Sequence, residues 1–164
     1  MSKLFKFIIF TGLVVMANPT LSSAQTGVTN KYKCMIQMSN YMGDGAYIVI
    51  SLIDSKGLYD KTLYVLGSDK KWYNSLKEWN KFYAKKTATI SAITGASVAG
   101  GDRSVNVIDI ETAKINAGYK LRFESAVEDK NYYVKDVEIP LTTETLSAKN
   151  EGTGFIRYVR FSAN

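Results

Sequence analysis

The strongest constraint on the fold is an alternation of apolar and polar side chains with a period of two residues. It is clearest over residues 119–128, where Tyr, Leu, Phe, Ser and Val alternate with Lys, Arg and Glu. Successive side chains of a β-strand point to opposite faces of its sheet, so this period is typical of a strand with one buried face. We therefore expect Glu124 and Glu128, on the polar face, to be exposed to solvent.

Other segments rich in β-forming residues extend this pattern along the chain. The further predicted strands are 31–38, 46–53, 58–66, 104–110, 132–141 and 154–161. Turn-forming residues over 40–45, 54–57 and 128–131 separate several of them. About seven short strands predict a mostly β fold, an immunoglobulin-like antiparallel β-sandwich. We expect the first three strands to form an antiparallel meander and residues 142–152 to form a loop.

One segment changes from strand to helical periodicity. Four large side chains recur at spacings of four, three and four residues: Trp72, Leu76, Trp79 and Tyr83. This spacing predicts one inserted α-helix over residues 69–83, with Ser68 or Asp69 as its N-cap. We expect its two tryptophans to pack on a sheet and its lysines to be solvated. The alternatives are a ligand-stacking role for the tryptophans and an anionic partner or membrane surface for the lysines.

The N-terminus has the composition of a cleavable secretory signal. Lys3 and Lys6 precede an apolar run over residues 7–17, and small residues end at Ala24. This run is shorter than the roughly 20 apolar residues that span a membrane. We predict a signal peptide over residues 1–24, a single domain over 25–164 without a membrane span, and a periplasmic or extracellular location. A retained N-terminal anchor is the alternative.

The residue types that the chain lacks restrict its chemistry. It has no histidine and one cysteine, Cys34, which excludes His-dependent triads, HExxH zinc sites and an internal disulfide. Cys34 falls on the apolar face of a predicted strand and should be buried. The formal charge of +6 becomes +4 once Lys3 and Lys6 are removed, and an exported chain is not expected to bind nucleic acid. We expect no catalytic residues and no metal.

Carboxylates leave one enzymatic alternative open. Glycoside hydrolases use two carboxyl groups about 5–9 Å apart, and several acidic residues, among them Asp102 and Glu124, can be paired in this way. A secreted carbohydrate-active or carbohydrate-binding protein therefore remains an alternative function.

A loop rich in small residues carries a resemblance to a known family. Residues 91–97 read Ser-Ala-Ile-Thr-Gly-Ala-Ser, after Lys-Trp-Tyr at 71–73 and before Gly-Tyr at 118–119. This order of motifs resembles the periplasmic family called domain of unknown function 2271, over residues 32–161. Ser91 and Val98 replace the family's usual Asp and Arg, and its Trp-Asp-Gly is missing around 107–111. The second half is also similar to the immunoglobulin-like domain of flagellar hook-capping proteins.

The resemblance implies a function in extracytoplasmic electron transfer or iron handling. Members of this family resemble, in their setting, proteins that act together with flavin transferases and PepSY-type membrane proteins. The resemblance therefore implies a non-catalytic accessory module with a membrane or periplasmic protein partner. The loop also resembles the site at which a hydroxyl accepts FMN as a phosphoester. In that case Ser97 is the acceptor, Thr94 and Gly95 complete the cofactor loop, and backbone N–H groups hold the phosphate. A purely structural turn is the alternative.

Overall fold

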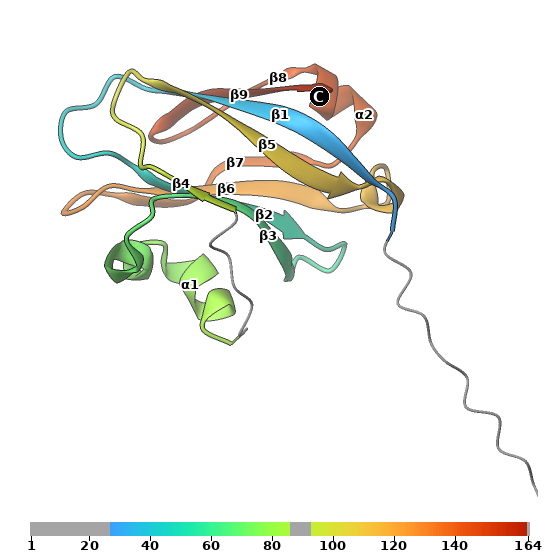
Figure 1. Ribbon diagram of the computed structural model, residues 1–164, viewed down its shortest axis with the longest axis horizontal. Helices are drawn as coiled ribbons and strands as arrows, with labels where there is room; N and C mark the ends of the chain where they lie inside the picture. The colour runs from blue at the N-terminus through green and yellow to red at the C-terminus, as the bar shows by residue number, and fades with distance from the viewer. Residues whose placement is uncertain (1–26, 86–92, 164) are drawn as a thin grey trace, which may run out of the picture.

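The computed structural model describes residues 27–85 and 93–163, which form two β-sheets stacked face to face (Figure 1). The four-stranded sheet has the order β5 (Arg103–Glu111), β1 (Thr29–Met38), β9 (Ile156–Ala163), β8 (Lys149–Glu151). The five-stranded sheet has the order β4 (Thr94–Gly95), β3 (Tyr59–Leu66), β2 (Tyr47–Ile53), β6 (Lys120–Ala126), β7 (Tyr132–Pro140). Neighbouring strands are antiparallel apart from β3 and β4. The mostly β sandwich is confirmed; its immunoglobulin-like type stays a prediction.

The main core lies between the two sheets and follows from the alternation. Cys34, Ile36 and Met38 of β1 are buried against the inner side chains of the other sheet, among them Ile50 and Phe123. The burial predicted for Cys34 is confirmed, and burial raises the pKa of its thiol. A thiol without access to solvent and with a raised pKa is unreactive.

A helical layer covers the outer face of the five-stranded sheet (Figure 1). It consists of the 3-10 helix η1 (Lys70–Ser75) and the α-helix α1 (Lys77–Tyr83). Their buried side chains pack on Val49, Val65 and Ala126 of the sheet. Strand β6 is consequently buried on both faces from Leu121 to Ala126, so the prediction of a solvated polar face on this strand was wrong.

The predicted helix over 69–83 is interrupted at Leu76, whose backbone has φ −86° and ψ 67°. Asp69 caps its start by accepting a hydrogen bond from the Lys71 N–H. The buried side chains then follow at intervals of three, as Tyr73, Leu76 and Trp79. Trp79 packs on the sheet as predicted, but Tyr73 takes the position expected for Trp72, which is only partly buried.

Two further predictions about the elements were wrong. Strand β1 does not form a meander with β2, because residues 39–46 carry the chain to the other sheet and β1 pairs with β5 and β9. The predicted loop over 142–152 contains the short helix α2 (Thr143–Ser147) and strand β8. Reciprocal hydrogen bonds between Thr142 and Thr145 form a capping box at the start of α2.

The connection from β5 to β6 includes a short 3-10 helix, η3 (Thr112–Lys114). Within residues 27–85 and 93–163, every helix is too short or too polar to cross a membrane. The predicted signal peptide and Ser91 lie outside the described residues.

Candidate functional site

The loop singled out from the sequence is attached to the edge of the five-stranded sheet. Thr94 and Gly95 form β4, which pairs with Val65 and Leu66 of β3. Farther along, Val98 forms an isolated bridge with Ala46, with N···O distances of 2.7 and 3.1 Å in the two directions. The segment between these two attachments is therefore held at the entrance to β2.

Ser97 lies between the two attachments with its side chain exposed. Its hydroxyl and the backbone N–H groups of Ala96 and Ser97 have no hydrogen-bond partner in the described part of the chain. The close approach of this loop requires Gly45, because a Cβ there would lie 2.6 Å from the Ser97 Oγ. The loop thus presents a free hydroxyl and two free N–H donors at one end of the sandwich.

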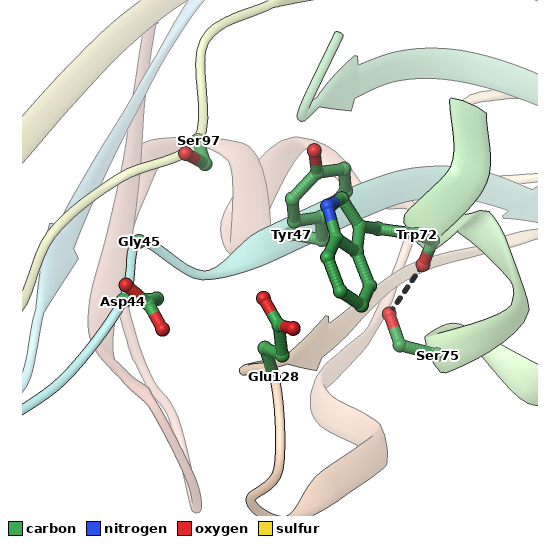
Figure 2. A pocket seen from close by; sticks show the side chains of 7 residues that line it. All are labelled: Asp44, Gly45, Tyr47, Trp72, Ser75, Ser97 and Glu128. Carbon is green, nitrogen blue, oxygen red and sulfur yellow. Dashed lines mark hydrogen bonds between the residues drawn. The ribbon is translucent and has the colours of Figure 1, made fainter. Parts of the chain in front are cut away.

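Ser97 lies at the edge of a pocket of about 220 Å³, shown in Figure 2. The other walls come from the residues before and at the start of β2, from η1, and from the turn between β6 and β7. They are Asp44, Gly45, Tyr47, Trp72, Ser75 and Glu128. A second hollow of about 190 Å³ shares Trp72, Ser75 and Glu128 with the first and continues toward Lys77 and Tyr132. We call the first hollow the Ser97 pocket.

Two aromatic rings form one wall of the Ser97 pocket. The Tyr47 ring lies close against Gly67, where a Cβ would be 2.1 Å from the ring. Burial raises the pKa of the Tyr47 hydroxyl, so this group is neutral at pH 7. Trp72 is held by the segment that follows it, since the Ser75 hydroxyl donates a 2.6 Å hydrogen bond to the Trp72 carbonyl (Figure 2). The half-exposed ring of Trp72 is available to a ligand.

Two carboxylates form the opposite side of the pocket. Asp44 is exposed and Glu128 is half-buried, and in Figure 2 both carboxylates lie near the space in front of the aromatic wall. Neither carboxylate takes part in an ion pair with another described residue. The pocket therefore combines aromatic faces with two carboxylates that form no ion pair within the described part of the chain.

The structure brings only part of the predicted cofactor loop to this pocket. Ser97 lines it, whereas Thr94 and Gly95 lie in β4 and hold the loop to the sheet. Sequence reasoning missed Asp44 and Tyr47 as site residues, and it interpreted Glu128 as a solvated residue on the polar face of a strand. The turn-rich sequence of residues 43–45 indicated a turn there but gave no sign of what lies beside it.

Glu124, considered as a possible catalytic acid, is fully buried beneath α1. Its carboxylate accepts hydrogen bonds from the hydroxyls of Tyr59 and Tyr132 and from the Trp79 backbone N–H at 3.2 Å. Burial raises the pKa of Glu124, against the effect of these three donors. The prediction that Glu124 is solvated was wrong, because the helical layer covers it.

Asp102 and Glu124, named as a possible carboxylate pair, lie at different sheets of the described structure. Asp102 is exposed just before β5 of the four-stranded sheet, whereas Glu124 faces α1 on the far side of the other sheet. Among the residues with described positions, no three His, Cys, Asp or Glu side chains are grouped as metal ligands.

Comparison with known families agrees with the motif analysis. The sequence matches the family described as predicted periplasmic protein, domain of unknown function 2271 (DUF2271), over residues 29–158. This match runs from the start of β1 into β9 and so includes strands of both sheets. The chain belongs to the DUF2271 family. The predicted family is confirmed, and its description as periplasmic agrees with the export predicted for this DUF2271 protein. No curated protein and no solved structure matches the chain.

Proposed function

We propose that this DUF2271 protein is an exported, non-catalytic accessory module that binds a membrane or periplasmic protein through the Ser97 pocket. One observation carries the proposal: the family's loop motif and a pocket with aromatic and acidic walls coincide at one end of the sandwich. The resemblance supplies the setting, extracytoplasmic electron transfer or iron handling linked to flavin or PepSY-type proteins.

The size and lining of the pocket favour binding to a protein. Sites for small molecules usually enclose about 300–1,000 Å³, whereas this pocket has about 220 Å³ and is open to solvent. Trp and Tyr are enriched at the anchor positions of protein interfaces, and this pocket presents one of each. The pocket therefore suits a single side chain of a partner.

Affinity purification from membranes tests this function. The secreted chain is immobilised and incubated with solubilised membranes of its source organism, and bound proteins are identified by mass spectrometry. We expect a membrane redox or iron-handling protein to be enriched and to be lost with Trp72→Ala. The matched control is Tyr158→Ala, which removes a partly buried aromatic ring from β9 in the other sheet. Equal capture by the two variants would contradict the proposal.

A second candidate function is covalent attachment of FMN to Ser97. It is favoured by the exposed hydroxyl, the two unpartnered N–H donors and the adjacent rings of Tyr47 and Trp72. With FAD as donor and a flavin transferase as catalyst, the Ser97 Oγ–P bond forms while the P–O bond to AMP breaks. The hydroxyl proton is released to solvent.

Co-expression with a flavin transferase tests the second candidate. We expect the intact mass to increase by one FMN phosphoester and the denatured band to fluoresce. Ser97→Ala should abolish both signals, and Ser55→Ala, which removes an exposed hydroxyl from the turn at the other end of β2, should retain them. An unchanged mass of the parent chain would exclude flavin attachment.

A further inference from the structure

The lining of the Ser97 pocket selects the charge of its occupant. Asp44 and Glu128 lie on one side, the rings of Tyr47 and Trp72 lie on the other, and no ion pair within the described chain neutralises either carboxylate. Aromatic faces carry negative electrostatic potential and attract cations within about 6 Å of the ring centre. Both walls therefore favour a positively charged group.

A cation of the chain itself already lies near the Trp72 ring. The Lys71 ammonium lies 5.1 Å from the centre of the Trp72 ring. Lys71 is also paired with Asp69, at 3.1 Å, outside the pocket lining. The negative charges that face the pocket itself remain available to a group supplied from outside the chain.

The residue types that line the pocket distinguish between cations. A guanidinium is planar, stacks on an aromatic face and donates hydrogen bonds from its edge in several directions. It can therefore contact Trp72 with its face while its edge donates to the two carboxylates. A lysine ammonium is a compact, strongly hydrated charge and gains less from a flat aromatic wall.

We propose that the Ser97 pocket binds the guanidinium group of an arginine side chain presented by a partner polypeptide. This inference rests on the proposed docking function and names the chemistry of the partner at that site. FMN attached to Ser97 would fill the same pocket of about 220 Å³, so arginine and FMN exclude each other sterically. The protein is therefore prepared without a flavin transferase for the test.

NMR spectroscopy can monitor the pocket through its tryptophan. The chain has two tryptophans, and therefore two indole N–H signals in a ¹⁵N-correlated spectrum. Trp79 is buried and donates its indole N–H to the Thr62 hydroxyl at 2.9 Å, away from the pocket. The secreted chain is titrated with a glycine-flanked arginine peptide and with the same peptide carrying citrulline, a neutral analogue of arginine, or lysine.

The expected result is a saturable shift of the Trp72 indole signal with the arginine peptide, while the Trp79 signal stays in place. The citrulline peptide should have no effect, and the lysine peptide should bind more weakly. In the double variant Asp44→Asn, Glu128→Gln the dissociation constant should rise roughly tenfold, which corresponds to about 1.4 kcal/mol for the loss of two partly exposed ion pairs. The control Asp109→Asn removes an exposed charge from β5 and should bind as the parent chain does.

Equal shifts with the arginine and citrulline peptides would overturn the proposal, as would unchanged affinity in the double variant. Binding of lysine as strong as that of arginine would refute the preference for guanidinium. None of these results bears on the capture of a membrane protein. If the arginine peptide fails to bind but the capture of a membrane protein still depends on Trp72, only the arginine proposal is rejected. If the capture itself fails, the docking function is rejected.

Discussion

Asp136 links the two sheets through a single buried carboxylate. It lies in β7 and is 1 % exposed. It accepts hydrogen bonds from the backbone N–H groups of Thr153, Gly154 and Ile156, at 3.0, 2.7 and 2.9 Å. It also accepts one from the Ser125 hydroxyl of β6. One carboxylate thus satisfies donors from the five-stranded sheet and from the entrance to β9.

Asp136→Asn should destabilise the fold by about 2–3 kcal/mol. An amide has one acceptor oxygen, and its NH₂ group would face a donor that the carboxylate now satisfies, so a buried N–H group loses its partner. Urea unfolding followed by tryptophan fluorescence measures the loss. Asp109→Asn on the exposed face of β5 is the matched control and should change stability by less than about 0.5 kcal/mol. Equal effects of the two variants would refute this account of Asp136.

Glu124 should make stability depend on pH in a definite direction. Burial raises its pKa in the folded chain above the ordinary value of 4.5, so the folded state takes up the proton at a higher pH than the unfolded state. The favourable contribution is complete below pH 4.5 and is lost as pH rises through the folded pKa. The stability of the parent chain relative to Glu124→Gln should therefore fall as pH rises from 4.5 toward neutrality.

Unfolding of the two proteins at a series of pH values tests this sign. Glu144→Gln provides a control with the opposite trend. Hydrogen bonding, first from its own backbone N–H, lowers the pKa of Glu144, so its contribution is present above 4.5 and is lost as pH falls. A constant difference between the parent chain and Glu124→Gln would show that Glu124 titrates normally.

At the scale of elements, the start of β2 depends on a contact with the turn after β3. Gly67 has φ +126° and lies directly beneath the Tyr47 ring. Gly57, in the turn between β2 and β3, has φ +85° and no atom within 4 Å of the Cβ position. These two glycines share the left-handed conformation and differ in the space around them.

Gly67→Ala should cost about 1–3 kcal/mol more than Gly57→Ala. Both variants introduce the backbone strain of a positive φ, about 1 kcal/mol. At residue 67 the new methyl group also collides with Tyr47, and overpacking of this kind costs about 1–3 kcal/mol. Midpoints of urea unfolding give the comparison. Similar midpoints for the two variants would mean that the ring moves freely, and that the Tyr47 wall of the pocket is not fixed.

The elements that sequence patterns predicted well are those whose signal is local. The predicted strands over 46–53 and 58–66 agree with β2 and β3 to within one residue at each end. The partners of β1 were not predictable, because β5 and β9 come much later in the chain and pairing leaves no local pattern. The helix break at Leu76 was missed because a spacing of four, three and four fits a continuous α-helix.

At the scale of the whole molecule, the helix break at Leu76 also determines which side chains line the candidate site. In one continuous helix Trp72 would face the sheet, and the break leaves it at the pocket instead. The motif alone predicted Ser97. The remaining walls come from segments around residues 44–47, 72–75 and 128, which are far apart in sequence, so no local pattern could have joined them.

The predicted signal peptide also gives a testable prediction for the first residue of the exported protein. Produced in a bacterium with a periplasm, the exported protein should begin at Gln25, because small residues at 22–24 precede the predicted cleavage site. Intact-mass measurement of the periplasmic fraction checks this start. A mass that retains the apolar segment at 7–17 would indicate a membrane anchor instead.

Site-specific crosslinking in cells tests the central claim, docking through the Ser97 pocket, most directly. Labelling of an introduced cysteine is selective, because Cys34 is buried and unreactive. A cysteine introduced as Ala96→Cys lies beside Ser97 and leaves the hydroxyl intact. Its counterpart Lys56→Cys lies in the exposed turn beyond the other end of β2. In each of the two variants, the introduced cysteine carries a thiol-linked photoreactive group. We predict a crosslink to a membrane or periplasmic protein from residue 96 and none from residue 56. The same adducts from both positions, or none from residue 96, would contradict the Ser97 pocket as the docking site.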